Sequence, residues 1–456
     1  MKTLAWILIQ LLPALGFFLA LALLVHQNKP RRSPSSTIAW LLAIVLVPWL
    51  GVPAYIFFGG RKSQKMIRGK RSFGIGAIDA TKHLPLQMTG SNFPIRSDNG
   101  ITLLQTGEEA FIALNDLLEQ AETSIDIATY ILSNDNTGAI VLATLARKAS
   151  EGVRVRLLLD ALGSFSINKD ALSSLRSNGG QCAFFMPMIH LPFRGRANLR
   201  NHRKIAIVDS RNAILGGMNI AQEYMGPAID DDRWQDLSFF LMGSAIADLQ
   251  SVFNSDWSFA AKQEVIDVKV VDFSNSHAIT TIQVVPSGPD VGGDQLYENI
   301  LSMLFSAKQR VWIVTPYFVP DEMLIKAICI AAKRGVDVRI LVPLASNHRI
   351  ADLVRRSFLR QMQESGATVY KFTPGMMHGK AILIDDGLAV VGSMNMDLRS
   401  FFLNYEIALY IYDKNVVQKL DSWARGLMKR STTGVRTVGF AIEMIEGVAR
   451  LLAPLL

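Results

Sequence analysis

The sequence predicts an α/β protein in which two related domains follow two membrane-spanning helices. Two long apolar runs without a charge stand at the N-terminus, and strand-like and helix-like segments then alternate in the same order in both halves of the body. One polar pattern of 19 residues also occurs twice, at 201–219 and at 377–395. An α/β body that repeats both its elements and its polar residues indicates two halves related by a pseudo-twofold axis.

The N-terminal residues 1–60 contain two candidate transmembrane helices. Leu4–Val25 and Ile38–Phe58 carry no charged residue over 22 and 21 positions. Each could cross a hydrocarbon layer of about 30 Å at ~1.5 Å per residue. A cleaved signal peptide is the alternative for the first run, but that run is longer than the usual apolar part of such a peptide and a second run follows closely. We therefore expect both helices to be retained.

The charge distribution predicts the orientation of these helices. Residues 1–71 contain ten Lys and Arg and no acidic residue, whereas the remaining chain has 37 basic and 39 acidic residues, a net charge of −2. The connector 26–37 has three basic residues, and the opposite side of the two spans has seven. The positive-inside rule therefore places the body in the cytoplasm, with Arg61–Arg71 against anionic headgroups. The acidic body disfavours nucleic acid as a partner.

The body repeats one order of elements after a basic juxtamembrane linker. In the first half, Ser124–Leu132 and Val153–Asp160 have the composition of strands and flank a helix-like segment. In the second half, Arg310–Val319 and Val336–Pro343 flank another such segment. This alternation predicts a largely parallel sheet with helices on its faces. The expected bounds are 61–94 for the linker and 95–270 and 275–432 for the two domains.

The C-terminal segment 433–456 predicts a separate amphipathic helix. Its apolar residues recur at spacings of three and four, at Val438, Ile442, Ile445, Val448, Leu452 and Leu455. Packing of this face against the body and insertion of it into the membrane interface are both compatible with the pattern.

The repeated pattern is H-x-K-x4-D-x6-G-(G/S)-M-N, and its residue types suit a phosphodiester substrate. Two imidazoles can divide the work of attacking phosphorus and protonating the leaving alkoxide. Two lysines and two asparagines can hold the non-bridging oxygens while negative charge shifts during transfer. The residues are His202, Lys204, Asp209, Gly217 and Asn219 in the first copy, and His378, Lys380, Asp385, Ser393 and Asn395 in the second.

This duplicated motif resembles the signature of the phospholipase D superfamily, over about residues 95–432. The resemblance implies two α/β/α sandwich domains related by a pseudo-twofold axis. It implies that His202, Lys204, Asp209, His378, Lys380 and Asp385 are catalytic, although Asp209 and Asp385 look like structural supports of their strands. It also implies that Asn219, Asn395 and Ser393 bind phosphate. Gly217 departs from the serine of the superfamily pattern, which makes the two halves of the pocket unequal.

Members of the superfamily also orient each catalytic His with an acidic residue further along the chain. The matching positions are Asp236, which lies 34 residues after His202, and Glu406, which lies 28 residues after His378. Each acid is therefore expected to serve the His of its own half.

Within this superfamily the chain looks like the bacterial cardiolipin synthases. The likeness rests on GGMNIAQEYMG (216–226), QVVPSGPD (283–290), the two N-terminal spans and the ending RLLAPLL. It implies transfer of a phosphatidyl group between two phosphatidylglycerol molecules, with a phosphohistidine at His202 and with His378 as acid and base. It also implies a bilayer and anionic phospholipids as partners and no metal or other cofactor.

Three other functions are alternatives for this sequence. A membrane-bound phospholipase D that releases phosphatidic acid would use the same six residues, and it stays an alternative. A nuclease is disfavoured by the charge of the body, and a non-catalytic scaffold is disfavoured by two complete motifs. Five arginines are candidates for headgroup contacts, at Arg194, Arg196, Arg200, Arg355 and Arg356.

Overall fold

The computed structural model describes residues 34–58, 93–168, 170–187, 199–264 and 279–450, together with Leu11, Ala14, Gly16, Phe18, Lys70 and Phe73. The first predicted membrane span, Leu4–Val25, lies almost wholly outside these residues, as do most of the basic segment 61–71, Arg194, Arg196 and the last six residues.

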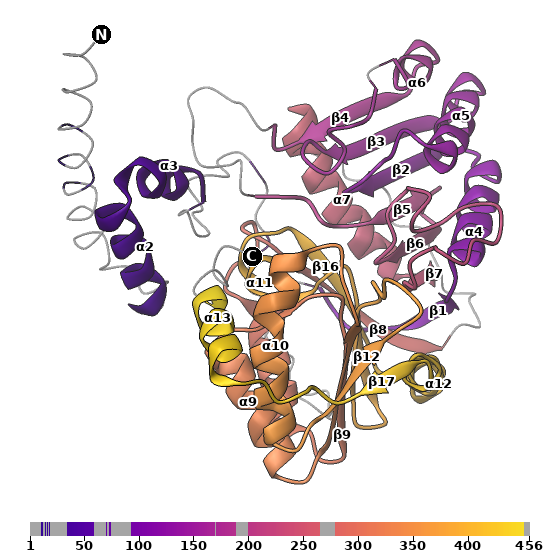
Figure 1. Cartoon of the computed structure of the whole chain (residues 1–456). Coiled ribbons are helices and arrows are strands. Elements are labelled where there is room, and N and C mark those ends of the chain that lie inside the picture. The colour runs from indigo at the N-terminus through magenta and orange to yellow at the C-terminus, as the bar shows by residue number, and fades with distance from the viewer. Residues whose placement is uncertain are drawn as a thin grey trace.

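The body of the protein is organised around one sheet of 15 strands, shown in Figure 1. The first half contains β1 (Arg96–Leu104), α4 (Gly107–Glu119), β2 (Ser124–Thr129), α5 (Asn136–Ser150), β3 (Arg154–Asp160), α6 (Ser173–Ser177), β4 (Gln181–Phe185), β5 (Ile205–Val208), β6 (Asn212–Gly216), β7 (Ser238–Gly243) and α7 (Ala245–Ala261). The second half contains β8 (Thr280–Ser287), α8 (Gln295–Ser306), β9 (Arg310–Val314), β10 (Phe318–Val319), α9 (Glu322–Lys333), β11 (Asp337–Pro343), α10 (Arg349–Glu364), β12 (Thr368–Phe372), β13 (Ala381–Ile384), β14 (Leu388–Gly392), β15 (Met396–Asp397), α11 (Leu398–Phe402), β16 (Glu406–Ile411), α12 (Lys414–Lys429) and β17 (Ser431–Thr433).

The strand order confirms the duplication that the sequence predicts. The order in the first half is β1-β7-β6-β5-β2-β3-β4, and in the second it is β8-β16-β14-β13-β9-β11-β12 with β17 added at the edge. The two halves meet where β1 pairs antiparallel with β8, at Arg96 with Ile282 and Asn99 with Thr280. A pseudo-twofold relation between the halves therefore passes through the β1–β8 pair.

The expectation of a largely parallel sheet is wrong. In the described part of the chain, only β2·β3, β3·β4, β9·β11 and β11·β12 are parallel neighbours within the large sheet. The motif strands β5 and β13 each run antiparallel to β2 or β9 and turn back into a hairpin. Asp209 and Ser210 adopt φ of 53° and 55° at the first of these turns, and Asp385 adopts 48° at the second. Left-handed residues of this kind favour tight hairpins, which join antiparallel strands.

The two crossover helices begin and end in the same way. The carboxylate of Asp135 accepts a hydrogen bond from Gly138 N at 2.9 Å at the start of α5, and that of Asp321 accepts from Leu324 N at 3.0 Å at the start of α9. Each helix is followed by a glycine in the left-handed region, Gly152 or Gly335. An acidic N-cap and a terminal glycine satisfy the backbone groups that a helix leaves unpaired.

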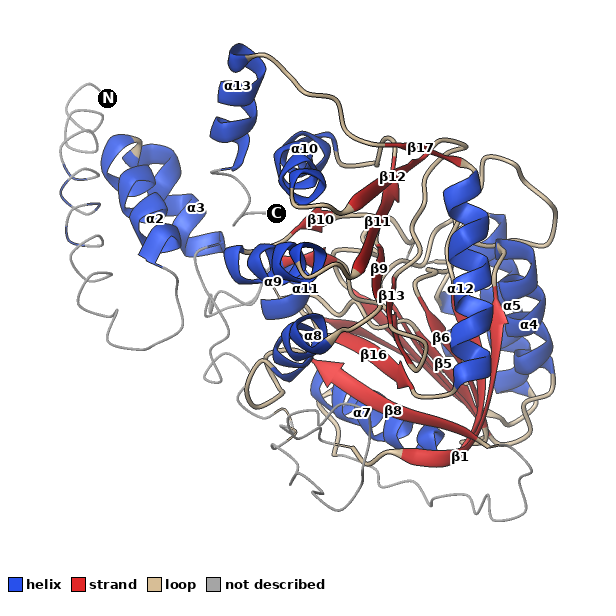
Figure 2. Cartoon of the chain, turned by 90° about the horizontal axis from the view of Figure 1, so that it is seen from below, coloured by secondary structure: helices blue, strands red, loops and turns tan. Residues whose placement is uncertain are grey.

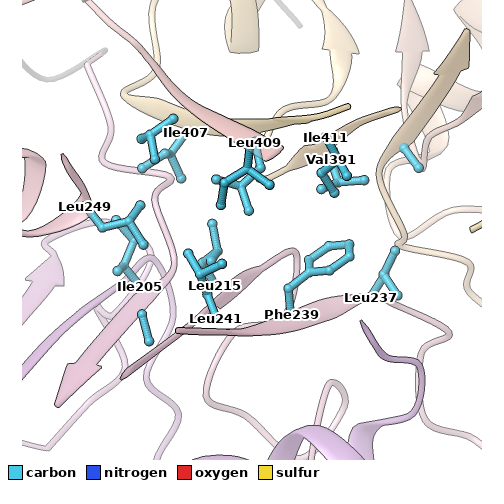
Figure 3. Packing of buried hydrophobic residues seen from close by; sticks show 14 of the residues in the cluster. Ile205, Leu215, Leu237, Phe239, Leu241, Leu249, Val391, Ile407, Leu409 and Ile411 are labelled. Atoms are coloured by element: carbon cyan, nitrogen blue, oxygen red, sulfur yellow. The ribbon is translucent and has the colours of Figure 1, made fainter. Parts of the chain in front are cut away.

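Three apolar clusters hold the layers together. α4, α5 and α6 cover the outer face of the first half, and α8, α9 and α10 cover the outer face of the second. Figure 2 shows these two groups on opposite sides of the strands. The third cluster joins the halves: Leu215 and Phe239 face Val391 and Leu409 in Figure 3. Because this inner cluster draws on both halves, it fixes one motif relative to the other.

The second predicted span, Ile38–Phe58, forms two helices rather than one. α2 (Pro34–Leu46) and α3 (Pro48–Phe58) pack against each other, with Ile44 and Val52 buried between them. The expected continuous helix is interrupted before Pro48, since proline supplies no backbone N–H and clashes with a preceding turn. None of the helices that the structure describes is both long enough and apolar enough to cross a membrane.

The predicted C-terminal helix is α13 (Phe440–Arg450), which lies against α10. Its buried residues are Glu446 and Ala449, and Glu446 forms an ion pair with Arg360. The side chains of Phe440, Met444 and Val448 are 76%, 56% and 64% exposed. The helix thus packs on the body through a face that includes a carboxylate, and it leaves apolar side chains outside.

Candidate active site

The fold brings the two motifs together by reciprocal backbone contacts. His202 and Lys204 stand just before β5, and His378 and Lys380 just before β13. The backbone N–H of His202 donates to Tyr405 O at 2.9 Å, and that of His378 donates to Gln235 O at 2.7 Å. Each motif is therefore hydrogen-bonded to the backbone just before a strand of the opposite half, β16 for His202 and β7 for His378.

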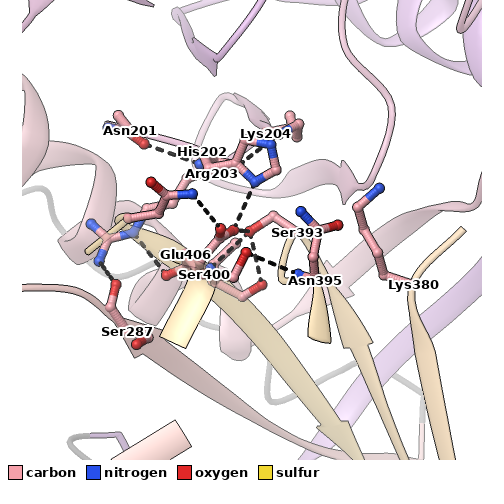
Figure 4. Close-up of polar contacts among 12 residues, drawn as sticks. Asn201, His202, Arg203, Lys204, Ser287, Lys380, Ser393, Asn395, Ser400 and Glu406 are labelled. Carbon is pink, nitrogen blue, oxygen red and sulfur yellow. Dashed lines mark hydrogen bonds and ion pairs between the residues drawn. The ribbon is translucent and has the colours of Figure 1, made fainter. Parts of the chain in front are cut away.

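Each motif imidazole lies against a carboxylate of the opposite half. His202 Nδ1 lies 3.0 Å from Glu406 Oε2, as Figure 4 shows, and His378 Nδ1 lies 2.6 Å from Asp236 Oδ2. The expectation that each acid serves the His of its own half is wrong. Tyr405 and Gln235 immediately precede the two acids and form bridges with the opposite motif, so the acids reach the His across the domain contact.

Glu406 is the centre of a buried hydrogen-bond network. Its Oε2 accepts from Ser393 Oγ, and its Oε1 accepts from Asn404 Nδ2 at 3.2 Å. Burial opposes ionisation, but the charge and hydrogen bond of His202 hold the pKa of Glu406 below its usual value. The predicted contact of Ser393 with phosphate is therefore replaced by a contact with Glu406. Ser393 thus holds the same carboxylate oxygen that lies beside His202.

The first half has no counterpart of this hydroxyl, and Gly217 explains why. A Cβ at Gly217 would lie 2.2 Å from Asp236 Oδ1. That oxygen also accepts from Leu237 N at 2.8 Å, so it has little freedom to move. Glycine is required here because the shorter Asp236 side chain occupies the space that a serine would take. Gly217 thus replaces the serine of the superfamily pattern in the half whose carboxylate is the shorter Asp236. The half with the longer Glu406 keeps the serine, Ser393.

The two lysines add positive charge beside the imidazoles. Lys204 Nζ donates to His202 O at 2.8 Å, and Lys380 Nζ lies 2.7 Å from His378 Nδ1. Burial lowers the pKa of Lys204 to about 7 and that of Lys380 to about 8. Burial also lowers the pKa of His202, and it lowers the pKa of His378 to about 3 with the help of Lys380. An anionic phosphodiester bound here would raise all four pKa values.

The two asparagines differ in their present partners. Asn219 Oδ1 accepts from Ile131 N at 3.2 Å. Asn395 Oδ1 is buried and has no hydrogen-bond partner within the ranges that the structure covers. A buried acceptor without a partner is available to a hydrogen-bond donor of a ligand, such as a hydroxyl, since leaving such a group unpaired costs free energy.

Asp209 and Asp385 lie at the far ends of the motif strands. Asp209 accepts backbone hydrogen bonds from Glu122, Thr123 and Ser124 at 2.7–3.0 Å. Asp385 binds the backbone before β9 in the same way, including Gln309 N at 2.7 Å. These bonds suit the structural role that the sequence suggested for the two aspartates, and among the contacts of the described residues neither aspartate reaches a motif imidazole.

Aromatic rings around the imidazoles were not predicted. Tyr130 lies 5.1 Å from the ring of His202, and Tyr224 and Trp234 lie 5.1 and 5.4 Å from that of His378. Tyr317 also lies near His378, with ring centroids 6.3 Å apart. One signal could have shown part of this set: Tyr130 directly follows a buried Thr at the end of a strand, and Tyr317 follows another buried Thr two residues later, after Pro316.

The predicted headgroup arginines that the structure describes are mostly engaged inside the protein. Arg200 is buried beside Asp160, 3.3 Å away. Arg355 is buried and donates to Pro343 O at 2.7 Å. Only Arg356 of the described three is exposed. Arg200 and Arg355 therefore hold the backbone around the site.

Comparison with known proteins agrees with this geometry. The family described as "Cardiolipin synthase, PLD-like domain" matches residues 114–257 and 300–428, and "Phospholipase_D-nuclease N-terminal" matches residues 18–60. A cardiolipin synthase of Listeria monocytogenes serotype 4b (strain CLIP80459) is 33% identical over 100% of both chains. That of Alkalihalophilus pseudofirmus is 33% identical over 93% of this chain and 90% of its own.

One solved structure shares the fold. The phosphatidylserine synthase of Haemophilus influenzae Rd KW20 superposes with a TM-score of 0.63 at 15% identity, and the match covers 80% of this chain and 96% of that one.

Proposed function

The chain belongs to the cardiolipin synthase family of the phospholipase D superfamily, and on this premise we propose that it is a phosphatidyl transferase that makes cardiolipin from two phosphatidylglycerol molecules. The observation that carries the proposal is the paired imidazoles, each with its Nδ1 on a carboxylate of the other half. This arrangement points Nε2 of His202 to the chemistry, while Nε2 of His378 lies 3.2 Å from Lys380 Nζ.

The proposed reaction has two displacements at phosphorus. Binding of the anionic phosphodiester favours the protonated form of His378. His202 Nε2 then attacks the phosphorus of the first phosphatidylglycerol, the bond from phosphorus to the glycerol oxygen breaks, and the protonated His378 gives its Nε2 proton to that oxygen. The terminal hydroxyl of the second phosphatidylglycerol then passes its proton to His378 and attacks phosphorus, which breaks the bond to His202 and releases cardiolipin. One phosphodiester replaces another, so the reaction needs no external energy source.

The remaining motif residues support the charge on phosphate. Lys204, Lys380, Asn219 and Asn395 are proposed to hold the non-bridging oxygens. Asp236 and Glu406 orient the imidazoles and stabilise their positive charge when they are protonated or phosphorylated. Asp209 and Asp385 act on catalysis only by holding the strands that carry the motifs.

Product analysis tests this proposal. Purified enzyme in mixed micelles with phosphatidylglycerol should release cardiolipin and glycerol in equal amounts. Phosphatidic acid as the main product would replace the proposal with hydrolysis, the alternative that the motif leaves open. His202→Ala and His378→Ala should abolish both products, which separates the enzyme from contaminating lipases.

We further propose that the enzyme is an integral protein of a bacterial inner membrane, with residues 1–60 in the bilayer and the body in the cytoplasm. The excess of basic residues on the side of the body supports this orientation. So do the exposed apolar side chains of α2 and α3, among them Leu46 and Leu50 at 72% and 71%. Protease added to intact spheroplasts should leave a C-terminal tag intact, and cleavage of the tag there would reverse the orientation.

The outer face of α13 is proposed to lie in the same membrane surface. Phe440, Met444 and Val448 stand four residues apart and are exposed, whereas Glu446 and Ala449 are buried. Figure 1 shows α13 on the same side of the body as α2 and α3. An amphipathic helix with one apolar face outside matches an interfacial helix, and its neighbour Arg450 could contact anionic headgroups.

We propose domain bounds that match this arrangement of membrane segment, body and interfacial helix. Residues 61–94 link the membrane segment to the body, 95–270 and 275–432 are the two catalytic domains, and 433–456 is the interfacial segment.

A further inference from the structure

Lys70 is a linker residue that is buried inside the catalytic body. Its Nζ lies 2.8 Å from Asp256 Oδ1 and donates to Ser255 Oγ at 3.1 Å, and it also pairs with Asp290. Its side chain is 0% exposed. Phe73 stands three residues later and exchanges backbone hydrogen bonds with Asp290 and Gly292. The sequence predicted that the basic segment 61–71 lies against lipid headgroups, and for Lys70 that prediction is wrong.

The main partner of Lys70 holds both neighbours of a catalytic His. Asp256 Oδ2 accepts from Asn201 Nδ2 at 3.0 Å, and Asp256 accepts two bonds from Arg203 at 2.8 and 2.9 Å. Asn201 and Arg203 flank His202 in the chain. Asp256 therefore connects Lys70 to the side chains of the residues on each side of the proposed nucleophile.

Arg203 extends the connection to the carboxylate that orients this nucleophile. Its Nε donates to Glu406 O at 3.0 Å, and its other end donates to Ser287 O at 3.0 Å, as Figure 4 shows. The ring of Tyr405 lies 5.1 Å from Lys70 Nζ and 5.4 Å from the Arg203 guanidinium, and Tyr405 O accepts the backbone N–H of His202. His202 and its acid are thus held by one continuous set of contacts.

The charges of this network balance only when Lys70 is present. Lys70 and Arg203 carry two positive charges, and Asp256 and Asp290 carry two negative ones, with side-chain exposures of 0% or 1%. A buried carboxylate that loses its cation is strongly destabilised, and its neighbours shift to relieve the charge. Removal of Lys70 would therefore disturb the residues that flank His202.

We propose that Lys70 is a positioning residue through which the juxtamembrane linker completes the active site. Docking of the linker at Asp256 and Asp290 holds Asn201, Arg203 and Tyr405, and these residues set the position of His202 against Glu406. Catalysis then requires the linker to be seated in the body. The consequence for turnover rests on the proposed function, whereas the structural connection does not.

The test compares four variants of the full chain in nanodiscs that contain phosphatidylglycerol. Lys70→Met removes the cation, Lys70→Arg keeps it, and Lys70→Met with Asp290→Asn removes one charge of each sign. Lys148→Met is the matched control, since Lys148 is a buried lysine that binds Ala121 O at 3.1 Å outside the site. The measurements are kcat, KM and hydrogen exchange of the segments 199–204 and 404–407 by mass spectrometry.

We expect Lys70→Met to lower kcat by roughly 10- to 100-fold, because small displacements of reacting groups cost that much. KM should stay within about twofold, and exchange should accelerate in both segments. The charge-balanced double variant and Lys70→Arg should each recover part of kcat. The control should keep wild-type kcat per folded molecule.

The proposal is overturned if Lys70→Met matches Lys148→Met in both kcat and exchange, or if the double variant recovers nothing. Should Lys70→Met fail to fold, the double variant decides, and wild-type kcat and exchange in it would overturn the proposal. Hydrogen exchange reports the connection even if wild-type enzyme makes no cardiolipin. Absence of cardiolipin would contradict the proposed function, and the exchange rates of 199–204 and 404–407 would still decide whether Lys70 positions His202.

Discussion

His202 Nδ1 and Glu406 Oε2 lie 3.0 Å apart, although 204 residues of chain separate them. His378 has the same relation to Asp236 over 142 residues. Neither half holds a complete pair of imidazole and carboxylate, so the site exists only when the inner apolar cluster has joined the halves. Assembly of the domains and assembly of the catalytic groups are therefore one event.

The crossed pairing predicts which His responds to which acid. Glu406→Gln should lower the pKa of His202 and leave that of His378 unchanged, because a nearby carboxylate favours the protonated imidazole. Asp236→Asn should do the same to His378. Both variants should lose roughly 10²- to 10⁴-fold in kcat. NMR titration of the histidine ring carbons checks the pairing, and a response of the His in the same half as the altered acid would contradict it.

Gly217→Ser should damage the enzyme, although it restores the superfamily pattern. The new Cβ would displace Asp236 Oδ1, which it approaches to 2.2 Å, and His378 would lose its orientation. We expect kcat to fall by roughly 10- to 100-fold. Gly426→Ser is the control, since a Cβ there meets no atom within 4 Å. An unchanged kcat for Gly217→Ser would show that Asp236 can move without cost.

Asp209→Asn should affect stability more than chemistry. The charged carboxylate accepts three backbone hydrogen bonds before β2, and its loss should lower the free energy of unfolding by about 1–3 kcal/mol. Asparagine tolerates the left-handed conformation at this position. Asp386→Asn at a 72% exposed ion pair should change stability by less than about 1 kcal/mol. Thermal unfolding and kcat per folded molecule separate the two roles, and a kcat loss without destabilisation would make Asp209 catalytic.

The buried lysines predict an alkaline limit of activity. As pH rises through 7 and 8, Lys204 and Lys380, whose pKa values burial lowers to about 7 and about 8, lose their protons. Loss of this charge weakens binding of the anionic phosphodiester, so kcat/KM should fall over that range. Lys204→Arg should move the fall to higher pH, because a guanidinium stays protonated. A pH profile of kcat/KM with the same alkaline limit in both enzymes would argue against these lysines.

The exposed face of α13 predicts direct contact with lipid. A fluorophore attached at Val448→Cys should shift to the blue and be quenched by lipids that carry a quencher in the acyl chain. The same fluorophore at Lys419→Cys, on the exposed face of α12, should remain in water. Cys182→Ser in both proteins removes the partly exposed native thiol. Equal quenching at the two sites, or loss of the signal through self-association, would contradict the proposal.

Much of the fold could be predicted from local patterns. The strands of Ser124–Leu132 and Val153–Asp160 and the helix between them were found because burial imposes a regular spacing of apolar residues. Strand direction was not, since the hairpin after each motif depends on the left-handed turn at Asp209 or Asp385. The break before Pro48 has a local signal, but the packing of α2 on α3 does not.

The site, like the fold, has one part that the sequence alone determines and another that only the tertiary structure decides. The chemistry was determined by the sequence alone: two copies of His, Lys and Asn at constant spacing already specify a pocket for a phosphodiester, because functional group and spacing along one strand are local properties. Which acid serves which His, why Ser393 binds Glu406, and where Lys70 lies were decided by the tertiary structure. Those contacts join residues that are far apart in the chain, and only the packing of one half on the other brings their atoms within hydrogen-bond distance.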